Sequence, residues 1–161
     1  MQINTRDARA CLHLACLLVA TFVVVSAQSG VPNGNWKLNV AKSKGSPTLP
    51  YKTASLVIHP VGPATMTMIE SVGADGATLH WNYTGMYDGK DVPISGNPAY
   101  DMASRKSVNA TTTETTYKKA GKVVVVNTNV LSADGKTLTV TTKGVDEQGR
   151  PVNSVLVFER Q

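Results

Sequence analysis

The chain has 161 residues, of which 42% are hydrophobic and 17% are charged, and its formal net charge is +5. This charge is modest, and the basic residues are spread along the sequence instead of clustering with aromatic residues, which argues against a nucleic-acid interface. Both cysteines, Cys11 and Cys16, lie near the N-terminus, so the remaining sequence has neither a disulfide nor a thiol ligand for a metal.

The first 27 residues have the pattern of a secretory signal peptide. Arg6 and Arg9 precede an apolar stretch from Ala10 to Val25, and the small residues of Val25-Ser26-Ala27 form the predicted cleavage site. We expect a mature domain of residues 28–161 without a stable membrane span, secreted to the periplasm or the extracellular space. An uncleaved anchor is one alternative, although about 16 apolar residues are fewer than a spanning helix needs. Lipidation at Cys16 is another, disfavoured because the apolar stretch continues past it.

The mature sequence consists of short β-type segments separated by turns. Valine and threonine are abundant, and turn signals recur about every 8 to 14 residues, which leaves no room for crossover helices. The glycine-centred turns are Ala74-Asp75-Gly76, Asp88-Gly89, Ala120-Gly121, Asp134-Gly135 and Gln148-Gly149. Strands are predicted at Asn35–Val40, Thr53–His59, Thr65–Glu70, Ala77–Tyr87, Asp91–Ile94, Ala99–Lys106, Thr111–Lys118, Lys122–Leu131, Lys136–Thr142 and Pro151–Glu159. Residues 41–51 are predicted to be a loop with one helical turn.

Alternation within the strands indicates which side chains share a face. One face of the strand at 77–87 carries Leu79, Trp81, Tyr83 and Tyr87, and the other carries Thr78, His80, Asn82 and Thr84. Met66 and Met68 share a face of the preceding strand, and Tyr100 and Met102 share one in a later strand. The run Val123–Val126 does not alternate, which indicates coverage on both faces or a bend.

These strands predict an all-β domain, an antiparallel meander closed into a barrel of eight to ten strands. Two packed sheets are the alternative, but closure removes the exposed edges that invite aggregation. A barrel of this size is either filled by side chains or holds one small ligand.

The two ends of the domain resemble those of calycin barrels. Gly34-Asn35-Trp36-Lys37-Leu38 is similar to the Gly-x-Trp opening of lipocalins and fatty-acid-binding proteins, and Val155–Arg160 looks like the closing strand of the latter. Most of the mature domain is similar to small secreted bacterial lipocalin-like proteins. The resemblance implies a structural role for Gly34, Trp36 and Arg160, with the Trp36 ring at the closed end beneath the Arg160 guanidinium.

Two departures from fatty-acid-binding proteins qualify this resemblance. The positions of their carboxylate-binding Arg-x-Tyr pair are Leu156 and Phe158 here, which predicts weak discrimination for free carboxylates. Residues 41–51 are also too few for their helical lid, and this moves the resemblance toward lipocalins.

The sequence shows little sign of catalysis or metal binding. There is no Gly-x-Ser-x-Gly motif, and His59 and His80 are the mature chain's only histidines. We therefore expect no enzyme activity, no cofactor and no metal site. Glu70 and Glu114 are expected to face outward; if either faced inward, near Arg105 for example, it would mark a polar anchor.

The leading hypothesis is a binding protein for a small, mostly apolar ligand. The predicted lining is Met66, Met68, Trp81, Tyr83, Tyr100, Met102 and Phe158, and a filled core is the alternative for the same residues. A second hypothesis is a structural protein with a filled barrel that binds a protein partner through the loops at 42–50 and 93–98. A hydrolase or isomerase that uses His80 or a buried acid is the least favoured. The sequence does not determine the oligomeric state.

Overall fold

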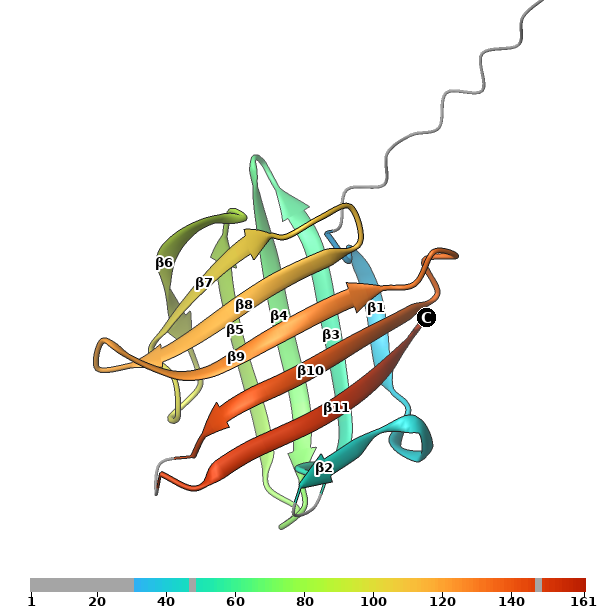
Figure 1. The fold of residues 1–161 in the computed structure, drawn as a ribbon, viewed down its shortest axis with the longest axis vertical. Coiled ribbons are helices and arrows are strands. Elements are labelled where there is room, and N and C mark those ends of the chain that lie inside the picture. The colour runs from blue at the N-terminus through green and yellow to red at the C-terminus, as the bar shows by residue number, and fades with distance from the viewer. Residues whose placement is uncertain (1–30, 47–48, 147–148) are drawn as a thin grey trace, which may run out of the picture.

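The computed structural model describes residues 31–46, 49–146 and 149–161, so the predicted signal peptide lies outside the described residues. Within them, ten strands form a closed antiparallel barrel in which each strand pairs with the next and β11 pairs with β1 (Figure 1). The strands of the barrel are β1 (Gly34–Leu38), β3 (Tyr51–Val61), β4 (Ala64–Gly73), β5 (Thr78–Gly85), β6 (Asp88–Ser95), β7 (Met102–Ser107), β8 (Thr112–Lys119), β9 (Lys122–Leu131), β10 (Thr137–Val145) and β11 (Pro151–Arg160). The predicted all-β meander barrel is confirmed.

The barrel is closed by short β1 against one end of long β11. β1 covers β11 only from Phe158 to Arg160, so the edge of β11 further toward its start is open to a second partner. The extra strand β2 (Lys44–Ser46) pairs there with Asn153–Val155. This strand was not predicted, whereas the single helical turn expected nearby is present as the 3-10 helix η1 (Val40–Lys42).

One predicted turn falls where the strand pairing is irregular. Asp88-Gly89 is part of β6, where the register against β7 shifts between Asp88 and Asp91, and the two pairs that join β5 to β6 place the midpoint of that hairpin at the same two residues. Gly89 has φ +79°, and an irregularity within a strand uses a glycine at positive φ just as a tight turn does. The dipeptide therefore does not distinguish a bulge from a hairpin.

The core lies between two layers of strands that cross at a steep angle in Figure 1, with β1, β3, β4 and β5 behind β8 to β11. One cluster of buried residues surrounds Trp36 and Phe158, and a second surrounds Trp81, Tyr83 and Tyr117. The predicted apolar face of β5 is confirmed, since Trp81 is 8% exposed and Tyr83 is 4% exposed.

The non-alternating valines of β9 mark an irregularity. Val123 is exposed and Val125 is buried, and the register between β8 and β9 shifts at Tyr117 and Lys118. The predicted bend is therefore the correct one of the two interpretations.

The barrel has one weakly paired seam, between β5 and β6. Only Asn82↔Ser95 and Tyr83↔Ile94 are paired there, whereas β3 and β4 are paired over their whole lengths. The described residues include no helix with the length and hydropathy needed to cross a membrane.

Candidate ligand-binding cavity

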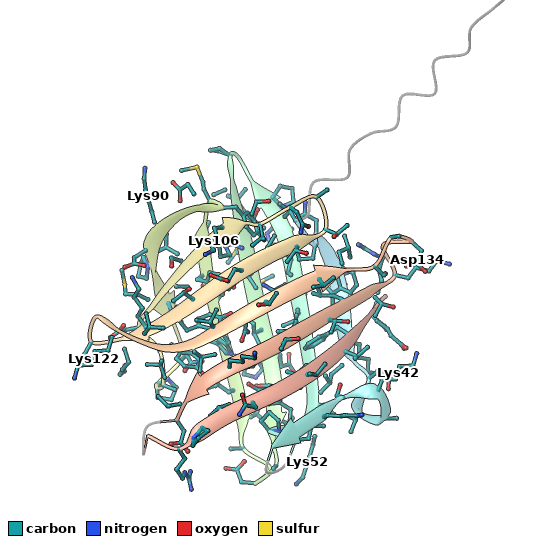
Figure 2. All side chains as sticks on the ribbon, in the orientation of Figure 1. Lys42, Lys52, Lys90, Lys106, Lys122 and Asp134 are labelled. Atoms are coloured by element: carbon teal, nitrogen blue, oxygen red, sulfur yellow. The ribbon has the colours of Figure 1, made fainter. Side chains whose placement is uncertain are left out.

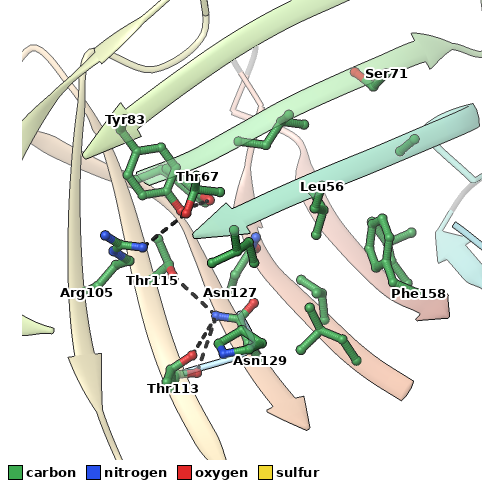
Figure 3. A pocket seen from close by; sticks show the side chains of 18 of the residues that line it. Leu56, Thr67, Ser71, Tyr83, Arg105, Thr113, Thr115, Asn127, Asn129 and Phe158 are labelled. Atoms are coloured by element: carbon green, nitrogen blue, oxygen red, sulfur yellow. Dashed lines mark hydrogen bonds between the residues drawn. The ribbon is translucent and has the colours of Figure 1, made fainter. Parts of the chain in front are cut away.

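The barrel contains a cavity of about 90 Å³ between the two layers. Its apolar wall comes mainly from β3, β10 and β11 and consists of Ala54, Leu56, Ile58, Leu138, Val140, Leu156 and Phe158. Its polar wall comes from β4, β7, β8 and β9 and consists of Thr67, Ser71, Arg105, Thr113, Thr115, Asn127 and Asn129. Figure 3 shows Leu56 and Phe158 on one side of this space and Arg105, Thr115 and Thr113 on the other. The interior is thus amphipathic.

The threonines and asparagines of the polar wall lie opposite each other on β8 and β9. Thr113 pairs with Asn129 and Thr115 with Asn127, so alternation turns all four inward together. The Asn129 amide nitrogen donates to the hydroxyls of Thr113 and Thr115, both at 3.3 Å. Asn127 Oδ1 is buried and has no hydrogen-bond partner among the described residues. Burying this oxygen without a partner costs desolvation free energy, and a hydrogen-bond donor bound in the cavity would offset that cost.

Arg105 is the main charged group at the cavity. Its side chain projects inward from β7 and is 3% exposed. Nη2 donates to the carbonyl of Thr65 at 2.6 Å and also to the carbonyl of Gly85, while Nη1 donates to the Thr67 hydroxyl at 3.1 Å. The guanidinium thereby reaches from β7 past the weakly paired β6 to β4 and β5.

Two tyrosine rings also contact this guanidinium. Cζ lies 4.5 Å from the ring centroid of Tyr87 and 5.0 Å from that of Tyr83. Cation–π contacts and carbonyl oxygens stabilise a buried cation without neutralising it. Arg105 Nε is buried and has no hydrogen-bond partner in the described parts of the chain.

The aromatic part of the cavity lies beside Arg105 and is uncharged. The Tyr83 and Tyr117 hydroxyls are 3.2 Å apart and share a hydrogen bond, and the Trp81 and Tyr83 rings stack with centroids 6.0 Å apart. Burial raises the pKa of Tyr117 well above its ordinary value, and the neighbouring Tyr83 adds to this rise. The Tyr117 hydroxyl is therefore a neutral donor and acceptor at physiological pH.

The structure brings three of the seven predicted lining residues to the cavity. Trp81, Tyr83 and Phe158 line it, whereas Tyr100 is not part of the lining and stacks on Tyr117, with ring centroids 5.0 Å apart.

The other three, Met66, Met68 and Met102, lie on the outward faces of their strands. In β4 the inward face carries Thr65 and Thr67, both buried, and in β7 it carries Ala103 and Arg105. We predicted that the methionines face inward because they are apolar, but in β4 the buried residues are the threonines on the other face.

The three residues with predicted structural roles come together at one end of the barrel. Trp36 is 1% exposed, and its indole nitrogen donates to the Pro32 carbonyl at 2.8 Å. The Arg160 guanidinium lies over its ring, 4.3 Å from the centroid, as the resemblance implied. Gly34 lies against this pair, where a Cβ would be 2.2 Å from Arg160 Nη1.

The acidic and histidine side chains lie outside the cavity. Glu70 and His80 are exposed together on the outer surface, 3.6 Å apart, and Glu114 pairs with Lys106 at 2.8 Å. Both glutamates face outward as predicted. Lysines surround the barrel instead of forming one basic face, as Lys42, Lys90 and Lys122 show in Figure 2. Among the described residues no three His, Cys, Asp or Glu side chains are grouped to hold a metal ion.

Sequence reasoning did not assign the polar wall to the interior. Thr113, Thr115 and Tyr117 alternate on β8 and are 1%, 3% and 6% exposed, and this alternation was the available signal. Threonine is equally common on outward faces, so only the inward Tyr117 distinguishes the two sides.

Comparison with known proteins adds no assignment to this cavity: the sequence matches no protein-family model, and no curated protein matches it. The closed barrel is consistent with a calycin-like fold.

Proposed function

We propose that this protein is exported and that it holds or carries a small, mostly apolar molecule inside its barrel. The observation that carries this proposal is the interior cavity between an apolar wall and a polar one. Binding cavities are commonly apolar with a few convergent polar groups that orient the ligand. The signal-peptide pattern of the first 27 residues supports export, and the proposed role involves no catalysis.

The size of the cavity favours a compact ligand. The space of about 90 Å³ that the centre of a water molecule can reach holds several waters, at roughly one for every 10 to 15 Å³, and is below the range of pockets for drug-sized ligands. We therefore propose a molecule of a few non-hydrogen atoms, with its polar end toward β7 to β9.

Two measurements on protein purified from its own host test the proposal. Native mass spectrometry and organic extraction should reveal a bound small molecule, and tryptophan fluorescence should change when a panel of small apolar compounds is added. Trp81 lines the cavity, so Trp36→Phe leaves a single tryptophan that reports on the interior. A uniformly ligand-free mass together with unchanged fluorescence would overturn the proposal.

A cavity-filling variant provides the matched control. Ala54 lines the cavity, so Ala54→Leu should abolish the fluorescence response. Its neighbour Thr53 is exposed, so Thr53→Leu should leave the response unchanged.

A second candidate function is a filled barrel that binds a protein partner through its loops. The small volume of the cavity is the observation that favours it. The surface proposed for it needs correction, because Pro93 lies within β6 and pairs with Met102 of β7; the loop itself is Gly96–Asp101. A ligand-free barrel whose loop variants lose a partner would support this candidate.

A further inference from the structure

We propose that Arg105 anchors the head group of the ligand and that this head group is a carboxylate. The inference rests on the proposed function and names the chemical class that the cavity accepts. It differs from the resemblance to fatty-acid-binding proteins, whose carboxylate clamp would fall at Leu156 and Phe158 on β11. Both of those residues are buried in the apolar wall.

Arg105 has no counter-ion among the described residues. The six ion pairs among the described residues all involve other side chains. A cation that is 3% exposed and lacks a counter-ion is costly to bury, because neutral dipoles only partly replace its hydration. A monoanion bound beside Arg105 would neutralise its positive charge.

Hydrogen-bond donors are in excess around Arg105. The hydroxyl oxygens of Thr67 and Tyr87 accept from Arg105 Nη1, at 3.1 and 3.4 Å, so each keeps its own O–H to donate. The Thr115 hydroxyl likewise accepts from Asn129 at 3.3 Å. The structure shows no acceptor for these hydrogens among the described residues.

Two further donors belong to the same group. Arg105 Nε–H has no partner among the described residues, and whichever of the Tyr83 and Tyr117 hydroxyls accepts their shared bond keeps its own hydrogen to donate. All of these residues line the cavity. An ionised carboxylate only accepts, and its two oxygens provide about four acceptor sites, enough for most of these five donors.

The single charge of Arg105 favours a monoanion over a dianion. One guanidinium balances one negative charge, so a phosphate or sulfate dianion would leave uncompensated charge in the interior. The apolar wall of Leu56, Ile58 and Leu138 would contact a short alkyl chain. A small aliphatic monocarboxylate satisfies the charge, the donors and the volume together.

Isothermal titration calorimetry of the purified protein with butyrate and butyramide tests this inference. The two compounds have the same number of non-hydrogen atoms and differ in the charge of the head group. We expect butyrate to bind at least tenfold more tightly, because its carboxylate supplies the counter-ion that the buried Arg105 cation lacks, whereas the carboxamide leaves that charge unbalanced.

Variants of β7 and β8 assign the effect to the proposed residues. Arg105→Met should weaken butyrate binding at least tenfold and leave butyramide binding little changed, whereas Lys106→Met should change neither, because Lys106 faces outward to Glu114. Thr115→Val removes one donor without touching the Arg105 contacts and should weaken butyrate binding several-fold, against no effect for the outward Thr116→Val. If Arg105→Met does not fold, the comparison of Thr115→Val with Thr116→Val tests the carboxylate site by itself.

The outcomes separate the inference from the proposed function. Equal affinity for butyrate and butyramide, or butyrate binding that survives Arg105→Met or Thr115→Val, would overturn the carboxylate anchor and leave a neutral binding cavity. Binding of neither compound, with no molecule recovered by extraction, would overturn both.

Discussion

The guanidinium of Arg160 lies over the indole ring of Trp36, 4.3 Å from its centroid, and joins the last strand of the barrel to the first. Arg160 Nε also donates to the Gly135 carbonyl at 2.6 Å, and Nη1 donates to the Asn33 carbonyl at 2.7 Å. Arg105 makes the same kinds of contact with aromatic rings and carbonyls, but it is buried, whereas Arg160 is exposed. Because Arg160 is exposed, its guanidinium joins the two strands at little desolvation cost. Arg105 is buried, so its charge is costly unless an anion binds beside it, as we propose.

Gly34→Ala should separate Arg160 from Trp36. Gly34 has φ +135°, and a Cβ there would be 2.2 Å from Arg160 Nη1, so the guanidinium must move off the ring. We expect a loss of at least about 2 kcal/mol in the free energy of unfolding, from the strained backbone and the lost contacts together. Denaturant unfolding measures this loss.

The control for this variant is Gly62→Ala. Gly62 also has positive φ, at +58°, but an added Cβ meets nothing within 4 Å. It should cost only about 1 kcal/mol, the penalty of the backbone conformation. Equal losses in the two variants would mean that the Arg160 contact contributes nothing to stability.

The sequence predicted the architecture well because most strands obey a simple period of two. Trp81 and Tyr83 alternate with His80 and Asn82, and burial follows that alternation. The sequence is ambiguous where one residue type serves two purposes. A glycine at positive φ marks a bulge at Gly89 and a turn at Gly121, and the sequence alone does not separate them.

The cavity was harder to predict because its polar wall contradicts the usual rule of apolar residues inside. Thr65 and Thr67 of β4 are buried, while Met68 on the other face is 36% exposed. Arg105 is stabilised in the interior because its guanidinium reaches the carbonyls of Thr65 on β4 and Gly85 on β5. These contacts join residues that are more than 15 positions apart in the sequence, so local sequence patterns do not predict them.

The β5–β6 seam should be the first part of the barrel to open. With only two paired positions, amides of Asp88–Ser95 should exchange with solvent faster than those of Ala64–Gly73, which can be measured by hydrogen exchange. Gly96→Ala should accelerate this local exchange, because a Cβ there would lie 2.4 Å from the His80 carbonyl oxygen and would push the strands apart.

Gly89→Ala is the control for the seam. Gly89 also has positive φ, but its added Cβ meets nothing within 4 Å, so the variant should change global stability without selectively increasing exchange of the paired residues Ile94 and Ser95. Uniform exchange across β3 to β6 in the unsubstituted protein would contradict the prediction of a weak seam.

Alkaline pH should destabilise the fold through Tyr117. Burial, with a contribution from Tyr83, raises the pKa of Tyr117 in the folded state well above the value of 10 that applies when the chain is unfolded. Below pH 10 both states keep the proton, so this contribution to stability is fully present there. As the pH rises past 10, the unfolded state releases the proton while the folded state retains it, and stability falls by up to about 1.4 kcal/mol per pH unit.

Tyr117→Phe isolates this effect. The variant should lose some stability at neutral pH, because the hydrogen bond to Tyr83 is gone, and its stability should then fall less steeply above pH 10. Denaturant unfolding at a series of pH values, with tyrosinate absorbance of the folded protein as a second measurement, checks both expectations. Identical alkaline slopes would show that Tyr117 titrates normally when folded.

Asn127→Leu should stabilise the protein and abolish ligand binding. The substitution removes a buried acceptor, Oδ1, that has no partner among the described residues, and it places an apolar side chain of similar size in the cavity. We expect a gain of about 1 to 2 kcal/mol in the free energy of unfolding, because an unsatisfied buried polar group is removed and apolar area is buried.

The outward-facing Asn153→Leu on β11 is the control and should change stability by less than about 0.5 kcal/mol. A loss of stability in Asn127→Leu would mean that Asn127 binds an internal water in the absence of ligand. A gain in stability with binding retained would place the ligand outside this cavity. A gain accompanied by loss of binding would show that the polar wall is maintained at a cost to stability, which is expected of a binding site and not of a filled core.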